Sequence, residues 1–301
     1  MNVPASLSRG LWMILATPFD ASGAVDHASL ECQVALAEDV GAQGVVALGV
    51  FGESAALDLA EQGDVVRTVA ATSDLPVVVG LAGRTTAVAS EQALIGLQGG
   101  SGRVAAFMAQ INSADPVVVS EHLHRLHSAT GVGIVLQDYP LVSGIRVSTA
   151  QVLRVIDDCA FVVAVKAEAP PTALAIAQLS AAADLPVFGG LGGVGLVDEL
   201  ACGAAGAMTG FSHPEGLVQV LNAYESGGFE AARAAWAPWL PLANFEGQAG
   251  VGLALRKELL HRRGILAHPM VRPPSPAAPA ELLPLLDEHL KSVVANRLLE
   301  V

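Results

Sequence analysis

Eight short apolar runs follow one another along this chain, and they constrain its fold more than any other feature of the sequence. Each lies near a glycine or proline, and the stretches between them carry apolar residues at helical spacing. The runs are LWMILATPF (11–19), GVVALGV (44–50), PVVVGLAG (76–83), RVAAFMAQ (103–110), VGIVLQDYP (132–140), FVVAVKAE (161–168), PVFGGLGG (186–193) and AGAMTGF (205–211). Strand and helix are therefore expected to alternate.

Eight such units favour a closed parallel barrel with helices outside, because each near-continuous apolar strand must be covered on both faces. An open doubly wound sheet is the alternative, but the first unit lacks a GxGxxG turn. We predict an α/β fold, a TIM (β/α)8 barrel over residues 1–213 with a C-terminal helical extension, 214–301, packed on the barrel. Within the extension, a Pro-rich linker (268–279) precedes a last helix with Pro284 in its first turn.

Composition excludes several classes of partner. The formal net charge of −13 leaves no broad basic surface for nucleic acid. The basic cluster at 256–263 is interpreted as a solvated helix face, with an anion site as the alternative. No run approaches the ~20 apolar residues of a membrane span. Cys32, Cys159 and Cys202 are widely separated, without zinc or disulfide spacing. We expect a cytoplasmic protein with no metal and no membrane or nucleic-acid partner.

Lys166 is the residue that points to chemistry. The other two lysines, Lys257 and Lys291, lie in helix-patterned stretches where a solvated amine is expected. Lys166 instead ends an apolar run, and the carboxyl ends of barrel strands form the active site. A desolvated amine has a lowered pKa and can attack a carbonyl to form a Schiff base. The alternative is a structural lysine paired with Glu168.

A second candidate is GVFGES (49–54), which closes the second run. Its two glycines, followed by Glu53 and Ser54, could turn backbone N–H groups toward an anion. The alternative is a strand-to-helix turn capped by Ser54.

Together these segments resemble the dihydrodipicolinate synthase and N-acetylneuraminate lyase family of class I, pyruvate-type Schiff-base barrels. The resemblance rests on GLWMILATPFDASGAVD, GVFGES, VKAEA, GGLGG and GAAGAMTG in that order, and it covers almost the whole chain. It implies a lyase without a cofactor that acts on a 2-oxo acid such as pyruvate. It also implies a homo-oligomer, a tetramer or dimer, for which Trp236 and Trp239 of the tail are candidate contact residues unless the tail packs on its own barrel.

The resemblance assigns Lys166 the role of Schiff-base nucleophile and gives the substrate carboxylate to the backbone at Val50 and Phe51. Glu168 is expected to be the partner of Lys166 or a general base. The remaining substrate-binding positions that we predict are Gln137, Gly190, Leu191, Gly192 and Met208. His213 is expected to be incidental.

The fifth run departs from the family pattern. The usual Tyr-Asn-x-Pro falls on residues 137–140, so Gln137 stands at the catalytic tyrosine position, and both threonine positions of the second run are apolar. Tyr139 lies two residues later on the same strand face and is our candidate acid–base group. The arginine that some synthases carry after this proline is absent. Synthesis of dihydrodipicolinate is therefore not expected.

These departures leave two hypotheses. The leading one is an aldolase, dehydratase or hydratase that works through an iminium on Lys166. The rival is a non-catalytic barrel that binds a 2-oxo acid as a sensor or degenerate enzyme. Retention of Lys166 favours the enzyme, because a plain binding site gains little from a desolvated amine.

Overall fold

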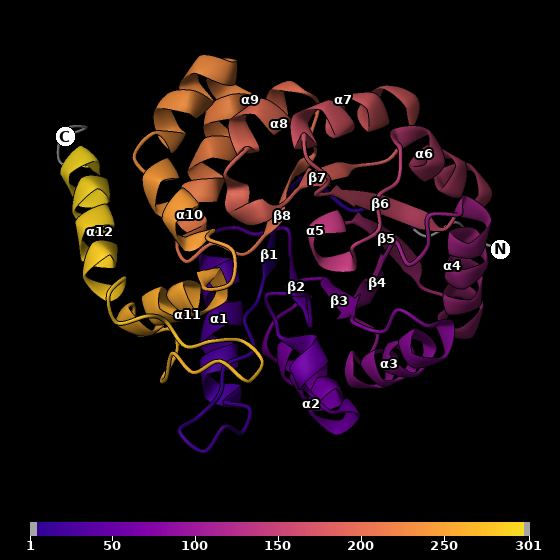
Figure 1. Ribbon diagram of the computed structural model, residues 1–301, viewed down its shortest axis with the longest axis horizontal. Coiled ribbons are helices and arrows are strands. Elements are labelled where there is room, and N and C mark those ends of the chain that lie inside the picture. The colour runs from indigo at the N-terminus through magenta and orange to yellow at the C-terminus, as the bar shows by residue number, and fades with distance from the viewer. Residues whose placement is uncertain (1–4, 298–301) are drawn as a thin grey trace.

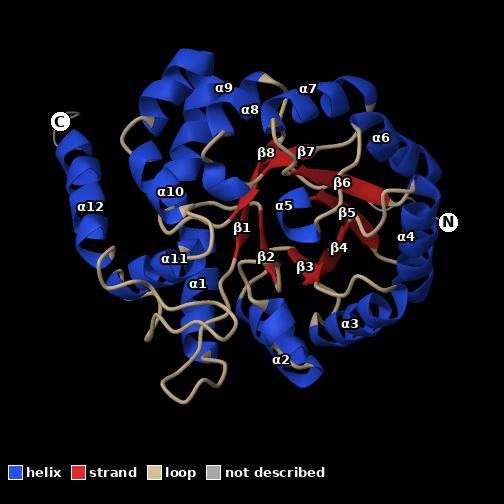
Figure 2. Ribbon diagram, in the orientation of Figure 1, coloured by secondary structure: helices blue, strands red, loops and turns tan. Residues whose placement is uncertain are grey.

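The computed structural model describes residues 5–297, and the strands in this part close into one parallel barrel in chain order. Figure 2 shows them at the centre of a ring of helices. The strands are β1 (Gly10–Ile14), β2 (Gly44–Ala47), β3 (Val77–Leu81), β4 (Val104–Gln110), β5 (Gly133–Asp138), β6 (Val162–Ala167), β7 (Val187–Gly189) and β8 (Gly206–Thr209). β8 pairs with β1 to close the barrel. The predicted barrel is confirmed, and each strand lies inside its predicted run except β1, which begins one residue earlier, at Gly10.

Helices connect the strands and cover their outer faces (Figure 1). They are α1 (His27–Asp39), α2 (Leu59–Thr72), α3 (Thr86–Gly99), α4 (Pro116–Thr130), α6 (Thr149–Asp158), α7 (Thr172–Ala182) and α8 (Leu196–Ala201), with the short α5 (Pro140–Ser143) over the mouth. Several begin where a Ser, Thr or Asp side chain accepts a hydrogen bond from the first turn.

Strand alternation separates two cores. Val45, Val79 and Leu136 point outward and pack against the helices, whereas their neighbours point inward. The inward cluster includes Trp12, Val46, Val78, Met108, Val135, Ala164, Phe188 and Met208. These side chains fill the barrel and form a floor beneath the residues at the carboxyl ends of the strands.

The chain after β8 is helical, as predicted. It forms α9 (Pro214–Trp236), α10 (Leu240–Glu246), α11 (Gly252–Arg262) and α12 (Leu283–Arg297), and residues 268–279 form no helix or strand. α9 contacts β1, and the boundary at residue 213 stays a prediction. The last residues predicted for the final helix, 298–300, lie outside the described part. None of the helices that the structure describes is long and apolar enough to cross a membrane.

Candidate active site

Lys166 stands at the carboxyl end of β6 with its side chain inside the barrel. Ala164, two residues earlier, belongs to the inward cluster, so alternation places Lys166 one layer nearer the mouth. The residue is 4% exposed, and its Nζ lies 3.1 Å from Oε2 of Glu168. The sheet register sets Gln137 on one side and Phe188 on the other. The amine is therefore buried beside a carboxylate at the mouth.

Glu168 is fixed by donors from two further directions. The Gln137 side chain donates from Nε2 to Oε2 at 2.7 Å, and the Leu191 backbone N–H donates to Oε1 at 3.3 Å. A side chain at Gly190 would collide with the Glu168 carboxylate, so glycine is needed there. The structure thus brings four of the predicted residues, Lys166, Gln137, Glu168 and Leu191, into one connected cluster.

Tyr139 lies at the rim of this cluster, half-buried, where β5 gives way to α5. Burial raises the pKa of its phenol, the negative charge of Glu168 raises it further, and Arg256 lowers it. Arg84 donates to the carbonyls of Val142 and Ser143 at 2.6 Å and 3.0 Å, which ties α5 to the end of β3. The position of Tyr139 is therefore supported by a helix that is itself anchored.

The segment after β2 forms a tight turn across the mouth. Leu48 and Glu53 have positive φ values of 59° and 51°. No described residue accepts a hydrogen bond from the backbone N–H of Val50 or Phe51, so both groups are available to a ligand. The Phe51 ring lies against Gly210, directly after β8, where a Cβ would come within 2.6 Å of it.

The cap that we considered at Ser54 is not present. Ser54 begins a 3-10 turn, η1 (Ser54–Ala56), and α2 starts later behind a capping box made by Asp58 and Glu61. Glu53 turns away in a left-handed conformation because its carboxylate is engaged by the C-terminal tail. No helix N-terminus therefore supports this turn as an anion site.

A cavity of about 340 Å³ opens beside the cluster, on the side of β2 to β5. Its lining includes Val50, Arg84, Met108, Gln110, Gln137 and Ser275. The size suits a small molecule. Gln110 was missed in the sequence, and its buried Oε1 accepts no hydrogen bond from any described residue. The sequence could have indicated this residue, because Gln110 is a polar residue at the end of an apolar run, and the carboxyl ends of barrel strands form the active site.

The other predicted positions differ in depth. Met208 is fully buried in the inward cluster, so it belongs to the floor rather than the mouth. Leu191, Gly192 and Gly193 form the 3-10 turn η2 after β7, and the Gly192 N–H donates to Thr209 Oγ1 at 2.8 Å. Both backbone N–H groups are thus used within the chain, because that of Gly192 donates to Thr209 and that of Leu191 donates to Glu168.

The basic stretch on α11 was wrongly interpreted as a solvated face. Lys257 is fully buried, where it pairs with Glu53, donates to the Met270 carbonyl at 2.8 Å, and lies 4.3 Å from the centre of the Phe19 ring. Burial lowers the pKa of its amine, whereas Glu53 raises it. The helix returns to the barrel mouth, and periodicity within one helix cannot reveal which tertiary surface it meets.

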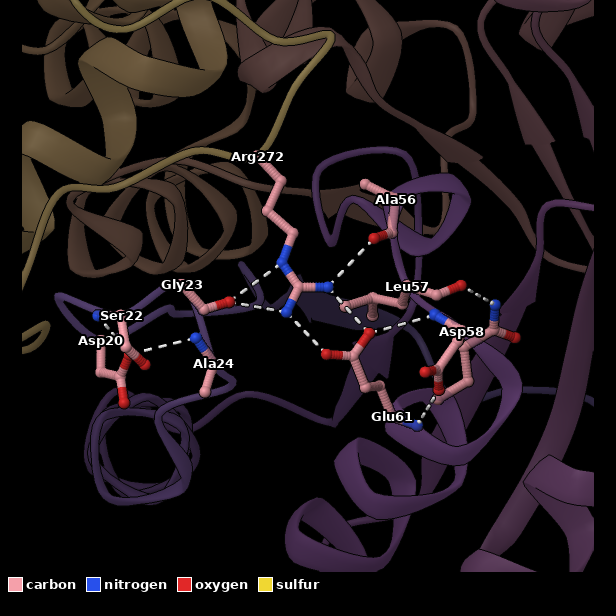
Figure 3. A network of polar contacts seen from close by, with 10 residues as sticks. Asp20, Ser22, Gly23, Ala24, Ala56, Leu57, Asp58, Glu61 and Arg272 are labelled. Carbon is pink, nitrogen blue, oxygen red and sulfur yellow. Dashed lines mark hydrogen bonds and ion pairs between the residues drawn. The ribbon is translucent and has the colours of Figure 1, made fainter.

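The linker after α11 is also tied to the barrel (Figure 3). The Arg272 guanidinium donates to the Gly23 and Ala56 carbonyls and forms an ion pair with Glu61 at 2.6 Å. Its backbone N–H donates to Glu53 at 2.8 Å. The last part of the chain therefore completes one wall of the mouth.

His213 and the tail tryptophans lie together away from Lys166. The His213 ring is 5.4 Å from that of Trp239, and Phe211 packs edge-on against Trp236. Both tryptophans are 2% exposed. The idea that they supply contact surface for an oligomer is wrong, and the alternative that the tail packs on its own barrel holds for them.

Glu199 of α8 is a further buried acid, also missed in the sequence. Its Oε1 accepts from the Thr172 hydroxyl at 2.7 Å, whereas its Oε2 has no hydrogen-bond partner among the described residues. Burial, and to a lesser extent the charges of Glu168 and Asp198, raises its pKa to about 7. It lies behind β7, where any side chain at Gly189 would collide with it.

Comparison with known proteins identifies relatives along almost the whole chain. The model of the Dihydrodipicolinate synthetase family matches residues 7–293. A protein named L-2-keto-3-deoxyarabonate dehydratase from Azospirillum brasilense is 29% identical over 276 residues, which cover 89% of each chain. A 4-hydroxy-tetrahydrodipicolinate synthase from Kineococcus radiotolerans is 29% identical over 279 residues, 90% of this chain and 89% of its own.

A solved structure agrees with these relatives. The crystal structure of dihydrodipicolinate synthase from Rhodopseudomonas palustris superposes with a TM-score of 0.89 at 28% identity, and it covers 97% of this chain and 100% of its own. The likeness extends through both the barrel and the helical tail.

Proposed function

The chain belongs to the dihydrodipicolinate synthetase family, and we propose that it is a class I lyase that acts on a 2-oxo acid through a Schiff base on Lys166. The pairing of buried Lys166 with Glu168 at the barrel mouth is the observation that carries the proposal. An amine with a carboxylate beside it can pass its proton on and attack a carbonyl carbon. Water then leaves and an iminium forms.

The substrate carboxylate is assigned to the turn after β2. The backbone N–H groups of Val50 and Phe51 have no acceptor among the described residues, and Val50 lines the cavity beside Gln137. Neutral N–H donors bind a carboxylate well in a partly desolvated site. Their side chains can be apolar because only the backbone is used.

Among lyase reactions, we favour dehydration. Glu168 would remove a proton from C3 of the iminium, giving an enamine whose electrons expel the C4 hydroxyl group. Tyr139 would protonate this leaving group, so that it departs as water, because a phenol carries an exchangeable proton. Water then releases the product from Lys166. The dehydratase relative supports this choice.

Borohydride trapping with pyruvate tests the proposal. We expect one reduced pyruvate adduct per chain, located on Lys166 by peptide mass spectrometry. An adduct that persists in Lys166→Ala would identify a different nucleophile, and no adduct in the wild type would reject the Schiff base. Incubation with 3-deoxy-2-oxo acids then separates the two lyase reactions, since aldol cleavage releases pyruvate and dehydration does not.

The rival function is a non-catalytic barrel that binds a 2-oxo acid. The apolar residues Val50 and Phe51 and the amide of Gln137, at positions where the family carries hydroxyl groups, favour it. Calorimetry that detects 2-oxo acid binding, together with no turnover across hydroxylated and aldehyde co-substrates, would support this function instead.

A homo-oligomer, tetramer or dimer, and a cytoplasmic location stay predictions. Sedimentation velocity at micromolar concentration tests the first, and a monomer there would reject it.

A further inference from the structure

The side chain of Arg256 on α11 is held in one orientation, and neither the packing of its helix nor the proposed Schiff-base chemistry explains why. Its Nε donates to Oε1 of Glu246 at 2.8 Å. Glu246 is fully buried and also accepts from the Ser212 hydroxyl and the Ser212 N–H. The carboxylate is thereby held in place, and it fixes the orientation of the guanidinium.

The far end of this guanidinium is unused. No described residue accepts a hydrogen bond from Nη1 or Nη2 of Arg256. Neither nitrogen is among the fully buried polar atoms that lack a hydrogen-bond partner. The side chain keeps 14% of its surface exposed. Two parallel N–H donors on a planar fork match the two oxygens of a carboxylate.

Arg256 lies near the same mouth as Lys166, close enough to Tyr139 for its charge to lower the pKa of that phenol. A Cβ at Gly192 would lie 2.6 Å from Arg256 Nη2, so the guanidinium packs against the η2 turn. The preceding residue of that turn, Leu191, donates its N–H to Glu168, the partner of Lys166. The Arg256 Cζ also lies 5.5 Å from the centre of the Phe51 ring, at the turn assigned to the substrate carboxylate. One short turn thus separates the arginine from the reacting centre.

We propose that Arg256 binds a second carboxylate at the far end of the substrate, so that this enzyme selects 2-oxo acids with a terminal carboxylate. The inference rests on the proposed Schiff-base function and adds the substrate class. The three residues directly after Pro140 include no arginine, since residues 141–143 are Leu, Val and Ser. The tail supplies the cation instead, from a residue far along the chain.

The ion pair with Glu246 does not prevent Arg256 from binding a substrate carboxylate. It uses only the Nε edge of the guanidinium, and its charge is shared with the donors of Ser212. A substrate carboxylate would approach the opposite edge, in a partly desolvated setting where charge-assisted hydrogen bonds are strong. Arginine is suited to two such partners because its five donors point in fixed directions.

Matched pairs of 2-oxo acids test the proposal without the need for turnover. The wild-type protein is trapped with borohydride in the presence of 2-oxoglutarate or 2-oxopentanoate, and of 2-oxoadipate or 2-oxohexanoate. The two members of each pair have the same chain length, but one ends in a carboxylate and the other in a methyl group. We expect trapping on Lys166 to favour the dicarboxylate of at least one pair by about 10-fold at low salt. Equal trapping within both pairs overturns the proposal.

Two variants attribute the preference to this side chain. Arg256→Met with Glu246→Gln removes both charges together, which avoids a buried unpaired carboxylate. Arg256→Lys retains a charge for Glu246 but lacks the planar fork. Both are expected to lose most of the preference, and Arg262→Met, on the exposed face of the same helix, is expected to keep it. A preference that persists in Arg256→Lys overturns the proposal even if the double variant does not fold.

Pyruvate separates failure of this inference from failure of the proposed function. Pyruvate has no terminal carboxylate, so its trapping on Lys166 reports the Schiff base alone. Pyruvate trapping without discrimination in the longer pairs rejects only the role of Arg256. An absence of pyruvate trapping in the wild type rejects the Schiff base on which this role depends.

Discussion

Two buried lysines at the same end of the barrel have different degrees of hydrogen bonding. Lys257 uses Glu53, the Met270 carbonyl and the face of the Phe19 ring, so its ammonium group is surrounded by partners. Lys166 has Glu168 as its partner, and that carboxylate is shared with Gln137 and Leu191. Burial alone therefore does not identify a reactive amine. We expect the reactive amine to be the one with donor capacity to spare, which lies beside Gln137 of the cavity lining.

The largest expected effect tests that difference directly. Lys166→Met should reduce borohydride trapping of pyruvate to background, because the attacking amine is gone. Lys257→Met should leave trapping on Lys166 in the protein that remains folded. The two variants are compared by intact mass at a temperature below both unfolding transitions. Adduct loss in Lys257→Met alone would reverse the roles that we give to the two lysines.

Tyr139→Phe tests whether Lys166, as proposed, works with a nearby acid. We expect turnover on the true substrate to fall by roughly 10²- to 10⁴-fold, the usual contribution of one acid–base group. Pyruvate trapping should remain, since Lys166 and Glu168 are unchanged. The measurement compares kcat with the yield of adduct in the same preparations. Unchanged turnover would move the acid role to Glu168 or to water.

The fully partnered lysine should matter for stability instead. Lys257→Met leaves Glu53 buried without its cation, and we expect the free energy of unfolding to fall by roughly 3–5 kcal/mol. Adding Glu53→Gln should restore part of this loss, because the uncompensated charge is removed. Urea unfolding followed by circular dichroism measures both. A Lys257→Met protein as stable as the wild type would show that this pair is not structural.

Glu199 can be compared with the two lysine partners, Glu53 and Glu168, because it is a buried carboxylate that forms no ion pair with a described lysine. Its pKa of about 7 in the folded protein exceeds the ordinary value of 4.5, so between these pH values the folded state holds more protons than the unfolded state. Stability contributed by this proton is complete below pH 4.5 and is lost as the pH rises through 7. The loss amounts to about 3 kcal/mol by pH 8.

Glu199→Gln should remove this decline while its amide oxygen still accepts from Thr172. Unfolding at pH 5 and pH 8 is measured for both proteins, and the stability difference between the two pH values should shrink by about 2.5 kcal/mol. An unchanged difference would mean that Glu199 is ionised in the folded protein at both pH values.

The sequence allowed the barrel to be predicted because each strand is a short apolar run beside a glycine or proline, a local pattern. Lys166 and Glu168 could also be found, since they end one such run. Lys257, Arg256 and Glu246 could not. Their burial depends on where the tail returns, and a helix that packs against a polar mouth has the same local pattern as one that faces solvent.

Gln110 and Glu199 show a second limit. An amide at a strand end and a carboxylate in a short helix are common in sequences, and only the three-dimensional surroundings reveal that an oxygen of each is buried without a donor. The same holds for Ser54, which has the residue type of a helix cap but lies in a turn that Glu53 shapes for distant partners.

The contacts of Glu53 also order events in time. Its partners Lys257 and Arg272 are 204 and 219 residues further along the chain. At a synthesis rate of ~5–20 residues per second, Glu53 is made roughly 10 to 40 s before Lys257. During that interval the turn after β2 lacks its contacts with the tail. The barrel mouth of a nascent chain is therefore incomplete until Lys257 and Arg272 have been translated.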